Sequence, residues 1–238
     1  MEPEELRNTL LEKFHLALAR ESIKEEELHE KGHPSVTGLV YDCLRRCYYQ
    51  VTYPDVIIDP KGAIRTWIGR KLHETSILEG KMELELEYKG IRGRIDEYKD
   101  GILLDKKTTR HIPRVPYEHH VRQIEYYWVL CERNGYHVDI AAIMYINVDS
   151  AEIEVFPITL ERDLAEIENE MLEKYRVIMK CLETGILPPR KMRTWSPETS
   201  RMVCQYCSYY GICMREDYED PRWKAFKEAK KEDGKKKV

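Results

Sequence analysis

Residues 82–109, MELELEYKGIRGRIDEYKDGILLDKKTT, decide the fold of this chain. From Met82 to Tyr88 apolar residues alternate strictly with glutamates, which is the pattern of a half-buried β-strand. Gly90 and the pair Asp100-Gly101 then separate two further strands, and Asp-Gly between such segments is a strong signal for a tight hairpin. The sequence therefore predicts a three-stranded meander in this region.

Two aspartates and a lysine occupy defined places in this meander. Asp96 falls in its second strand and Asp105 in its third, after the apolar pair Leu103-Leu104. Because side chains alternate along a strand, Lys107 projects from the same face as Asp105. Neighbouring strands lie about 4.8 Å apart, so the two carboxylates can hold one cation between them. The alternative is a solvated strand face with a surface ion pair of little energetic value, and these residues alone favour neither interpretation.

A divalent cation at this place would support a particular chemistry. Mg²⁺ and Mn²⁺ take oxygen ligands and keep several waters, one of which can become a nucleophile. A lysine on the same face can orient that water or neutralise negative charge that develops on a phosphate.

Helical segments on either side of the meander add further polar residues. Upstream, Gly69 and His73 lie in a segment with an apolar side, and a single histidine on a helix is more often structural than a ligand. Downstream, Gln123 and Tyr127 are four residues apart in a helix predicted over 117–133, so they share one face.

The rest of the chain is predicted to complete an α/β domain. A loop over 111–116 precedes the helix that carries Gln123, and β-rich runs follow at 138–148 and 152–158. Apolar residues at steps of four and three then predict a long helix from Leu160 to Leu182. At the other end, residues 1–30 form an expected amphipathic helix, and Ser35 or Thr37 is a candidate cap for a helix that includes Cys43 and Cys47.

Four of the seven cysteines have the pattern of a metal site. Cys204, Cys207 and Cys213 form a CxxCx5C cluster, and Cys43 is the obvious fourth thiolate. Four thiolates suit either a structural zinc or an iron–sulfur cluster, and the asymmetry of three close ligands with one distant one favours the iron–sulfur cluster. Cys47 competes for the place of Cys43. The remaining two cysteines fit small buried residues of helices: Cys131 and Cys181.

The order of these motifs resembles a known family. GxxxH at Gly69–His73, GxxD ending at Asp96, DxK at Asp105–Lys107 and QxxxY at Gln123–Tyr127 follow one another as in the RecB-like branch of the PD-(D/E)XK nuclease superfamily. With one cysteine before these motifs and CxxCx5C after them, the chain resembles the iron–sulfur RecB-like nucleases over roughly residues 35–215. The stand-alone CRISPR-associated RecB-like exonuclease, the fourth Cas protein family, is the nearest in arrangement because no GxxxxGK[ST] phosphate loop is present. The family commonly has Pro-Arg after its first cysteine, whereas Leu44 follows Cys43 here.

The resemblance implies an α/β, restriction-endonuclease-like mixed sheet flanked by helices, with an iron–sulfur-bound helical subdomain formed by N- and C-terminal segments. It implies a metal-dependent exonuclease that acts on single-stranded DNA ends and trims DNA for CRISPR spacer acquisition with the integrase subunits. Rival functions are a repair or replication nuclease outside CRISPR and a DNA-binding adaptor subunit with a structural cluster.

Residue roles follow from the same resemblance. Catalysis is assigned to Asp96, Asp105, Lys107, Gln123 and Tyr127. The metal ligands, for Mn²⁺ in preference to Mg²⁺ because one is a histidine, are His73, Asp96, Asp105 and the carbonyl of Lys106. The iron–sulfur ligands of an expected 4Fe–4S cluster are Cys43, Cys204, Cys207 and Cys213. Phosphate contacts are sought at Arg45, Arg46, Arg70, Lys71 and Arg94, and base stacking at Tyr48, Tyr49 or Trp67, although for each of these a surface or core role is the favoured alternative.

Composition limits where and how such a protein works. Charged residues make up 34 % of the chain and its formal net charge is −4, so contacts with nucleic acid must come from local clusters and not from an overall positive field. No apolar run approaches the ~20 residues of a membrane span, and the acidic start is unlike a signal peptide, so a cytoplasmic location is expected. The expected domains are 1–30, 31–215 and a charged tail at 216–238, and a homo-oligomer is left open.

Overall fold

The computed structural model of the chain describes residues 4–10, 13–14, 32–53, 60–190, 204 and 207–219. The chain divides into two compact units, Met1–Arg190 and Lys191–Val238. The named elements of the first unit are α2 (Val36–Leu39), α3 (Leu44–Thr52), α4 (Pro60–His73), β1 (Lys81–Tyr88), β2 (Ile91–Lys99), β3 (Ile102–Thr109), α5 (Glu118–Arg133), β4 (Ile140–Asn147), β5 (Ile153–Ile158) and α6 (Leu164–Thr184), and that of the second is α8 (Tyr210–Glu219).

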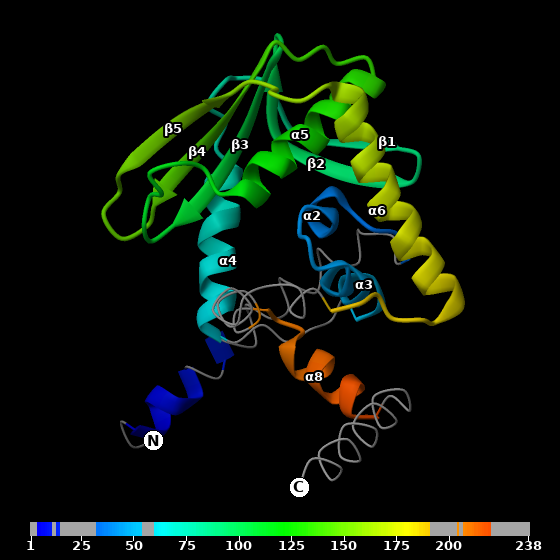
Figure 1. The fold of residues 1–238 in the computed structure, drawn as a ribbon. Helices are drawn as coiled ribbons and strands as arrows, with labels where there is room; N and C mark the ends of the chain where they lie inside the picture. The colour runs from blue at the N-terminus through cyan, green and yellow to red at the C-terminus, as the bar shows by residue number, and fades with distance from the viewer. Residues whose placement is uncertain are drawn as a thin grey trace, which may run out of the picture. The chain divides into compact units, whose positions relative to one another are not determined.

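A five-stranded sheet is the centre of the first unit, with the strands in the order β1-β2-β3-β4-β5 (Figure 1). All neighbouring strands are antiparallel except β3 and β4, which are parallel and are joined by α5. The sheet is therefore mixed, and the prediction of an α/β fold with a mixed sheet and flanking helices is confirmed.

Two tight hairpins join β1, β2 and β3. At the second, Asp100 has φ 45° and Gly101 φ 82°, and at the first, Lys89 and Gly90 have φ 50° and 84°. Two successive positive φ values are the mark of the type I′ turn, whose twist matches that of the strands it joins. The Asp-Gly hairpin predicted from the sequence is thus present.

The ladder between β2 and β3 ends early. Its register pairs Lys99 with Ile102, Tyr98 with Leu103 and Glu97 with Leu104. Beyond the last of these pairs, the N–H of Lys106 on β3 donates to the side chain of Asp96 on β2, with 2.6 Å between the nitrogen and Oδ2. A side-chain carboxylate therefore replaces the neighbouring strand as hydrogen-bond acceptor at the place where the two aspartates lie.

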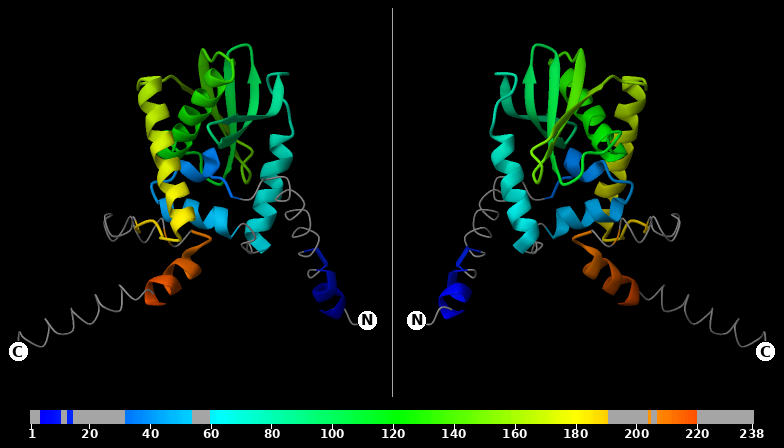
Figure 2. Two further views of the ribbon diagram at one scale, coloured as in Figure 1. Left: turned by 90° about the vertical axis from the view of Figure 1, so that its right-hand side faces the viewer. Right: turned by 90° about the vertical axis from the view of Figure 1, so that its left-hand side faces the viewer.

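Helices lie on both sides of the sheet, with α5 and α6 along one face and one end of α4 against the other (Figures 1 and 2). Lys107 of β3 reaches Gln123 on α5, whereas the adjacent Thr108 lies under Gly69 of α4, where an added Cβ would be 3.3 Å from Thr108 Oγ1. Because successive side chains of a strand point to opposite faces, α5 and α4 lie on opposite sides of β3. α6 packs against α5 and α3.

Close approach of α5 to β2 depends on Gly93, the glycine of the GxxD motif. A Cβ there would lie 2.8 Å from Leu130 Cδ2 and 2.9 Å from Tyr127 Cε1. Any side chain at this position would push the helix away, and with it Tyr127. The glycine therefore sets the distance between the helix and the sheet.

Two predictions about the N-terminal part need correction or restriction. The helix expected to include Cys43 is two short helices, α2 and α3, with Ser35 capping the first and Cys43 as the N-cap of the second. Residues 4–10 are helical, with Leu6 and Leu10 47 % and 57 % exposed, and most of the remaining 1–30 segment lies outside the described residues. Within the described part of the chain, no helix is both long and apolar enough to cross a membrane.

Candidate active site

The two aspartates lie beside each other where β2 and β3 separate. Asp96 is bonded on both oxygens, since Oδ1 lies 2.9 Å from His73 Nδ1 and Oδ2 accepts the Lys106 N–H. Asp105 has a side chain only 1 % exposed, and Lys107 Nζ lies 2.9 Å from its Oδ1 and 2.8 Å from its Oδ2. The contact with Oδ1 has hydrogen-bond geometry, whereas Oδ2 accepts no hydrogen bond from the described residues.

A chain of polar contacts runs from Asp105 to α5. Lys107 Nζ donates to Gln123 Oε1 at 3.0 Å, and Gln123 Nε2 donates to Tyr127 Oη at 2.8 Å. Both residues of the QxxxY motif are buried. The arrangement fixes the ammonium of Lys107 between a carboxylate and an amide, and the catalytic roles of Gln123 and Tyr127 stay predictions.

Burial and charge act differently on the titratable groups. Burial raises the pKa of Asp105 to about 6, with Lys107 opposing the rise and Asp96 adding to it. Burial also acts to raise the pKa of Asp96, but His73, Lys107 and the Lys106 N–H together lower it. Partial burial acts to lower the pKa of Lys107, yet the two carboxylates raise it, so its ammonium stays charged at neutral pH.

The residues present fit a divalent cation in one definite respect. Asp105 Oδ2 is a buried anionic oxygen that accepts no hydrogen bond, although Lys107 Nζ lies 2.8 Å away, and a hard cation would be a further partner for it. His73 Nδ1 lies beside Asp96 Oδ1, and metal-ligating histidines commonly make this contact with a carboxylate that orients the ring. Among the described residues, however, no three His, Cys, Asp or Glu side chains are already grouped as a metal site. The ligand set His73, Asp96, Asp105 and Lys106 therefore stays a prediction.

A buried ion pair on the opposite face of the sheet was not predicted. Glu97 is 0 % exposed and accepts hydrogen bonds from Ser76 Oγ and from the N–H groups of Ile77, Leu78 and Gly80. Lys106, 1 % exposed, lies 3.9 Å from Glu97 Oε2 and donates to the carbonyls of His73 and Thr75. Together the two side chains make hydrogen bonds along the whole turn after α4, and thereby position His73. The only signal in the sequence was the presence of charged residues on a strand face that the apolar pattern buries.

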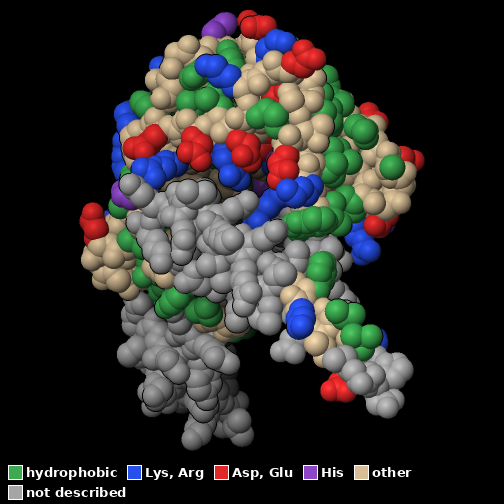
Figure 3. Space-filling model, turned by 180° about the vertical axis from the view of Figure 1, so that it is seen from behind, with side chains coloured by type: hydrophobic (Ala, Val, Ile, Leu, Met, Phe, Trp, Pro, Cys, Tyr) green, Lys and Arg blue, Asp and Glu red, His purple; other side chains and the backbone are tan. Residues whose placement is uncertain are grey.

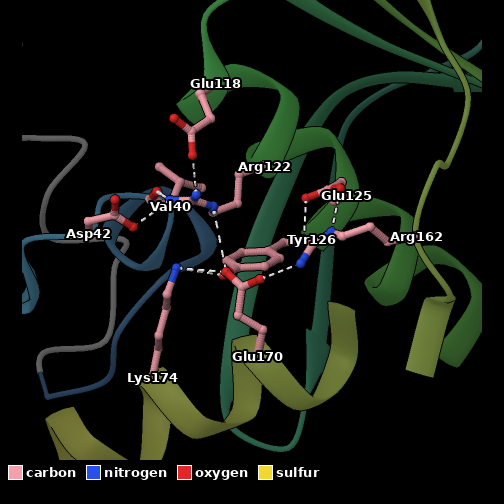
Figure 4. A network of polar contacts seen from close by, with 9 residues as sticks. All are labelled: Val40, Asp42, Glu118, Arg122, Glu125, Tyr126, Arg162, Glu170 and Lys174. Atoms are coloured by element: carbon pink, nitrogen blue, oxygen red, sulfur yellow. Dashed lines mark hydrogen bonds and ion pairs between the residues drawn. The ribbon is translucent and has the colours of Figure 1, made fainter. Parts of the chain in front are cut away.

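A second network, shown in Figure 4, anchors α5 to its neighbours. Arg122, the residue before Gln123, contacts Glu118, Glu170, the carbonyl of Val40 and Asp42. Its neighbours in the network extend the contacts along α5 and α6: Glu125, Tyr126, Arg162 and Lys174. The helix that orients Lys107 is thus tied both to α6 and to the segment that leads to Cys43.

The predicted phosphate contacts lie in different environments. Arg45 is buried and donates to the carbonyl of Pro188, while the guanidinium of Arg46 lies 3.7 Å from the ring centre of Tyr41. Arg94 pairs with Glu83 at 3.7 Å and Lys71 with Glu74 at 2.8 Å. On the face drawn in Figure 3, the described basic side chains are interspersed with acidic ones. A role for Arg45, Arg46, Arg70, Lys71 or Arg94 in binding nucleic acid stays a prediction.

The aromatic residues expected to stack bases also differ in exposure. Tyr49 is 1 % exposed and belongs to the core, Tyr48 packs against the core, and Trp67 is 39 % exposed. Tyr49 is therefore poorly placed to meet a ligand.

The cysteines fall into both units. Cys47 and Cys131 are buried, and burial raises the pKa of each thiol to about 12, whereas Cys43 and Cys181 are partly exposed. In the second unit the carbonyl of Cys204 accepts from the N–H of Cys207 at 3.0 Å, and Cys213 lies in α8.

Comparison with known proteins gives the family. Residues 9–214 match the model of the PD-(D/E)XK nuclease superfamily. The crystal structure of SSO0001 has the same fold, with 22 % sequence identity, a TM-score of 0.57, and coverage of 82 % of this chain and 94 % of that one. A protein from Eubacterium rectale described as an exonuclease covers 68 % of this chain and 72 % of its own, but 12 % identity and a TM-score of 0.35 are too low to support an argument. No curated protein matches the sequence. Because the match spans most of its length, this chain belongs to the PD-(D/E)XK nuclease superfamily, whose members hydrolyse nucleic acids.

Proposed function

We propose that the protein is a metal-dependent exonuclease that degrades single-stranded DNA from its ends. The observation that carries the proposal is the buried Asp105, whose Oδ2 lacks a hydrogen bond, joined through Lys107 and Gln123 to Tyr127. In this arrangement the Lys107 ammonium lies beside the Asp105 carboxylate, and a divalent cation would bind the carboxylate oxygen that accepts no hydrogen bond. Preference for ends and for single strands is supported only by the motif resemblance to the RecB-like branch.

Each side chain has a distinct task in this proposal. Mn²⁺ or Mg²⁺, held by His73, Asp96, Asp105 and the carbonyl of Lys106, would activate water and neutralise charge on the phosphate. Lys107 keeps its charge, because two carboxylates raise its pKa, and so offers hydrogen bonds to the attacking water or to the phosphate oxygens. Gln123 and Tyr127 restrict the lysine to one position, which is what catalysis by positioning requires.

The test is cleavage of end-labelled single strands with Mn²⁺ or Mg²⁺ by the wild type and by Asp105→Ala. We expect cleavage by the wild type and none by the variant. Asp105→Ala that degrades DNA at the wild-type rate would refute the site assignment. Internally labelled circular single strands serve as the control for attack at ends, since an exonuclease leaves them intact.

We further propose a 4Fe–4S cluster on Cys43, Cys204, Cys207 and Cys213. The buried thiol of Cys47, with its raised pKa, is a poor thiolate donor compared with the partly exposed Cys43 at the start of α3. A cluster on these ligands would join the segment before the nuclease motifs to the segment after them, and its binding energy would add to folding energy. Iron and acid-labile sulfide in anaerobically purified protein test this independently of activity, and one stoichiometric zinc in colourless protein would contradict it.

A role in trimming DNA for CRISPR spacer acquisition, alongside integrase subunits, follows from the same resemblance. The repair or replication nuclease has the same chemistry, so the test is association: the protein should co-purify with integrase subunits of its own host. The adaptor alternative requires an inert nuclease site, and cleavage that disappears in Asp105→Ala would exclude it.

A further inference from the structure

A row of planar side chains flanks the candidate active site. The rings of Tyr41 and His119 are stacked, with centroids 5.3 Å apart and planes inclined by 25°. His119 in turn stacks on Tyr117, at 5.7 Å and 18°. The guanidinium of Arg46 lies 3.7 Å from the Tyr41 centroid and continues the row. We call these four residues the stacking row.

The row is attached directly to the catalytic face of the sheet. Tyr145 of β4 is the register partner of Lys107 of β3, so the two side chains share one face. Its hydroxyl lies 2.7 Å from His120 Nδ1 and accepts the N–H of Tyr117 at 3.2 Å. His120 is three residues before Gln123 on α5, hence on the same side of the helix. The start of α5, with its N-cap Tyr117 and with His119 in the first turn, is therefore fixed beside Lys107.

Exposure separates the row from an ordinary aromatic core. Tyr145, which anchors it, is 0 % exposed, but Tyr117 is 44 % exposed and the neighbouring Val115 is 72 % exposed. His119 and Tyr41 are partly exposed. Tyr117 meets His120 and Tyr145 edge to face, at 79° and 81°, whereas the planes within the row are inclined by only 18° and 25° and end at the solvent-exposed ring of Tyr117. Another flat ring can stack on the exposed end of such a row.

We infer that Tyr117, backed by His119 and Tyr41, stacks an unpaired base of a single-stranded DNA substrate next to the phosphate held at Lys107. The inference rests on the proposed function and adds to it the residues that select an unpaired strand. A base within a duplex is stacked on both sides, and a terminal one is held by its pairing partner, whereas an unpaired base is free to lay its face on Tyr117. Arg46 at one end and Lys107 beside the row supply positive charge for the flanking phosphates.

Binding by full-length protein carrying Asp105→Ala, which prevents cleavage, tests the inference. The probes are a short labelled oligodeoxythymidine and a series in which one abasic nucleotide is moved along the strand. Stacking on an aromatic side chain contributes roughly a tenfold or larger factor in affinity per base. We expect Tyr117→Leu to weaken binding of the intact strand about tenfold, and one abasic position to weaken the parent by a similar factor. In Tyr117→Leu that abasic position should have no further effect, because both changes remove the same contact.

Tyr53→Leu is the matched control, since Tyr53 is 45 % exposed and lies at the end of α3, outside the row. It should bind like the parent, and Tyr117→Trp should retain the abasic effect. His119→Leu tests the row a second time, by removing the ring behind Tyr117. Equal binding by Tyr117→Leu and Tyr53→Leu, an abasic effect that persists in Tyr117→Leu, or no binding of single strands at all would each overturn the inference.

The outcome is distinguishable from failure of the proposed function. If Asp105-dependent cleavage is observed but the abasic series shows no dependence on Tyr117, the nuclease assignment stands and the stacking site does not. If the abasic series behaves as expected but the wild type cleaves nothing with Mn²⁺ or Mg²⁺, the stacking site stands and the catalytic proposal does not.

Discussion

Glu97→Gln should destabilise the protein far more than a surface substitution of the same kind. In the wild type the Glu97 carboxylate is 0 % exposed, accepts hydrogen bonds from the turn at 76–80 and lies 3.9 Å from the buried ammonium of Lys106. Glutamine removes the charge and places an NH₂ group against main-chain N–H donors. Breaking a buried pair in this way costs about 3–5 kcal/mol. For a chain of this size that corresponds to a fall in melting temperature of about 6–20 °C.

Thermal unfolding followed by circular dichroism at neutral pH measures the effect. The control is Glu83→Gln on β1, where the ion pair with Arg94 is exposed and its loss costs about 0–1 kcal/mol. Equal melting temperatures for the two variants would refute the argument that Glu97 holds the turn after α4.

The effect of pH provides a second check on Glu97. Burial acts to raise its pKa, but hydrogen bonds from Ser76, Ile77, Leu78 and Gly80 lower it below the ordinary value of 4.5. A lowered folded-state pKa contributes stability that is present above 4.5 and is lost as pH falls through the folded value. The difference in melting temperature between wild type and Glu97→Gln should therefore shrink below that pH, and a constant difference would contradict this account.

Three further predictions concern other contacts. Tyr127→Phe removes the hydroxyl that accepts a hydrogen bond from Gln123. The cleavage rate should fall about tenfold, while the melting temperature drops only about 2–4 °C, as expected for the loss of one hydrogen bond. An unchanged cleavage rate in a kinetic assay would show that Gln123 does not need this partner. Burial acts to raise the pKa of Glu170, but Lys174, Arg162 and Tyr126 lower it to about 2. The fall in melting temperature caused by Glu170→Gln should therefore diminish between pH 4.5 and pH 2. A fall that is as large at pH 2 as at neutral pH would be inconsistent with this network. Iron analysis and thermal melts of alanine variants should show loss of iron and lower stability for the proposed ligands Cys43, Cys204, Cys207 and Cys213. Iron should be retained for Cys47, Cys131 and Cys181, and if Cys47→Ala lost iron while Cys43→Ala kept it, the choice of fourth ligand would be wrong.

Local sequence patterns were sufficient for the strands and for the polar chain on α5. Alternation in residues 82–88 and the Asp100-Gly101 turn depend only on neighbouring residues, and so does the four-residue spacing of Gln123 and Tyr127. The parallel pairing of β3 with β4 is different, because it depends on how α5 crosses the sheet. No local pattern distinguishes it from an antiparallel return.

Contacts between distant segments account for what the sequence did not reveal. Glu97 and Lys106 fall on strand positions that the apolar pattern buries, but their partners are found only when the turn after α4 is placed over them. Tyr41 and His119 become neighbours only because the helices α2, α3 and α5 pack together, so the stacking row has no linear signature. Tyr49, which the sequence offered as a stacking residue, lies in the core for the same reason.

The early end of the β2–β3 ladder makes one amide a reporter of the active site. In an unbroken ladder the hydrogen exchange of an amide measures opening of the strands, but the N–H of Lys106 is held by the Asp96 side chain. Its exchange rate and chemical shift should therefore follow the charge and occupancy of that carboxylate. Titration with a divalent cation should move this resonance while amides paired within the ladder, such as that of Tyr98, keep their positions. Cation binding could then be measured without any nucleic acid present.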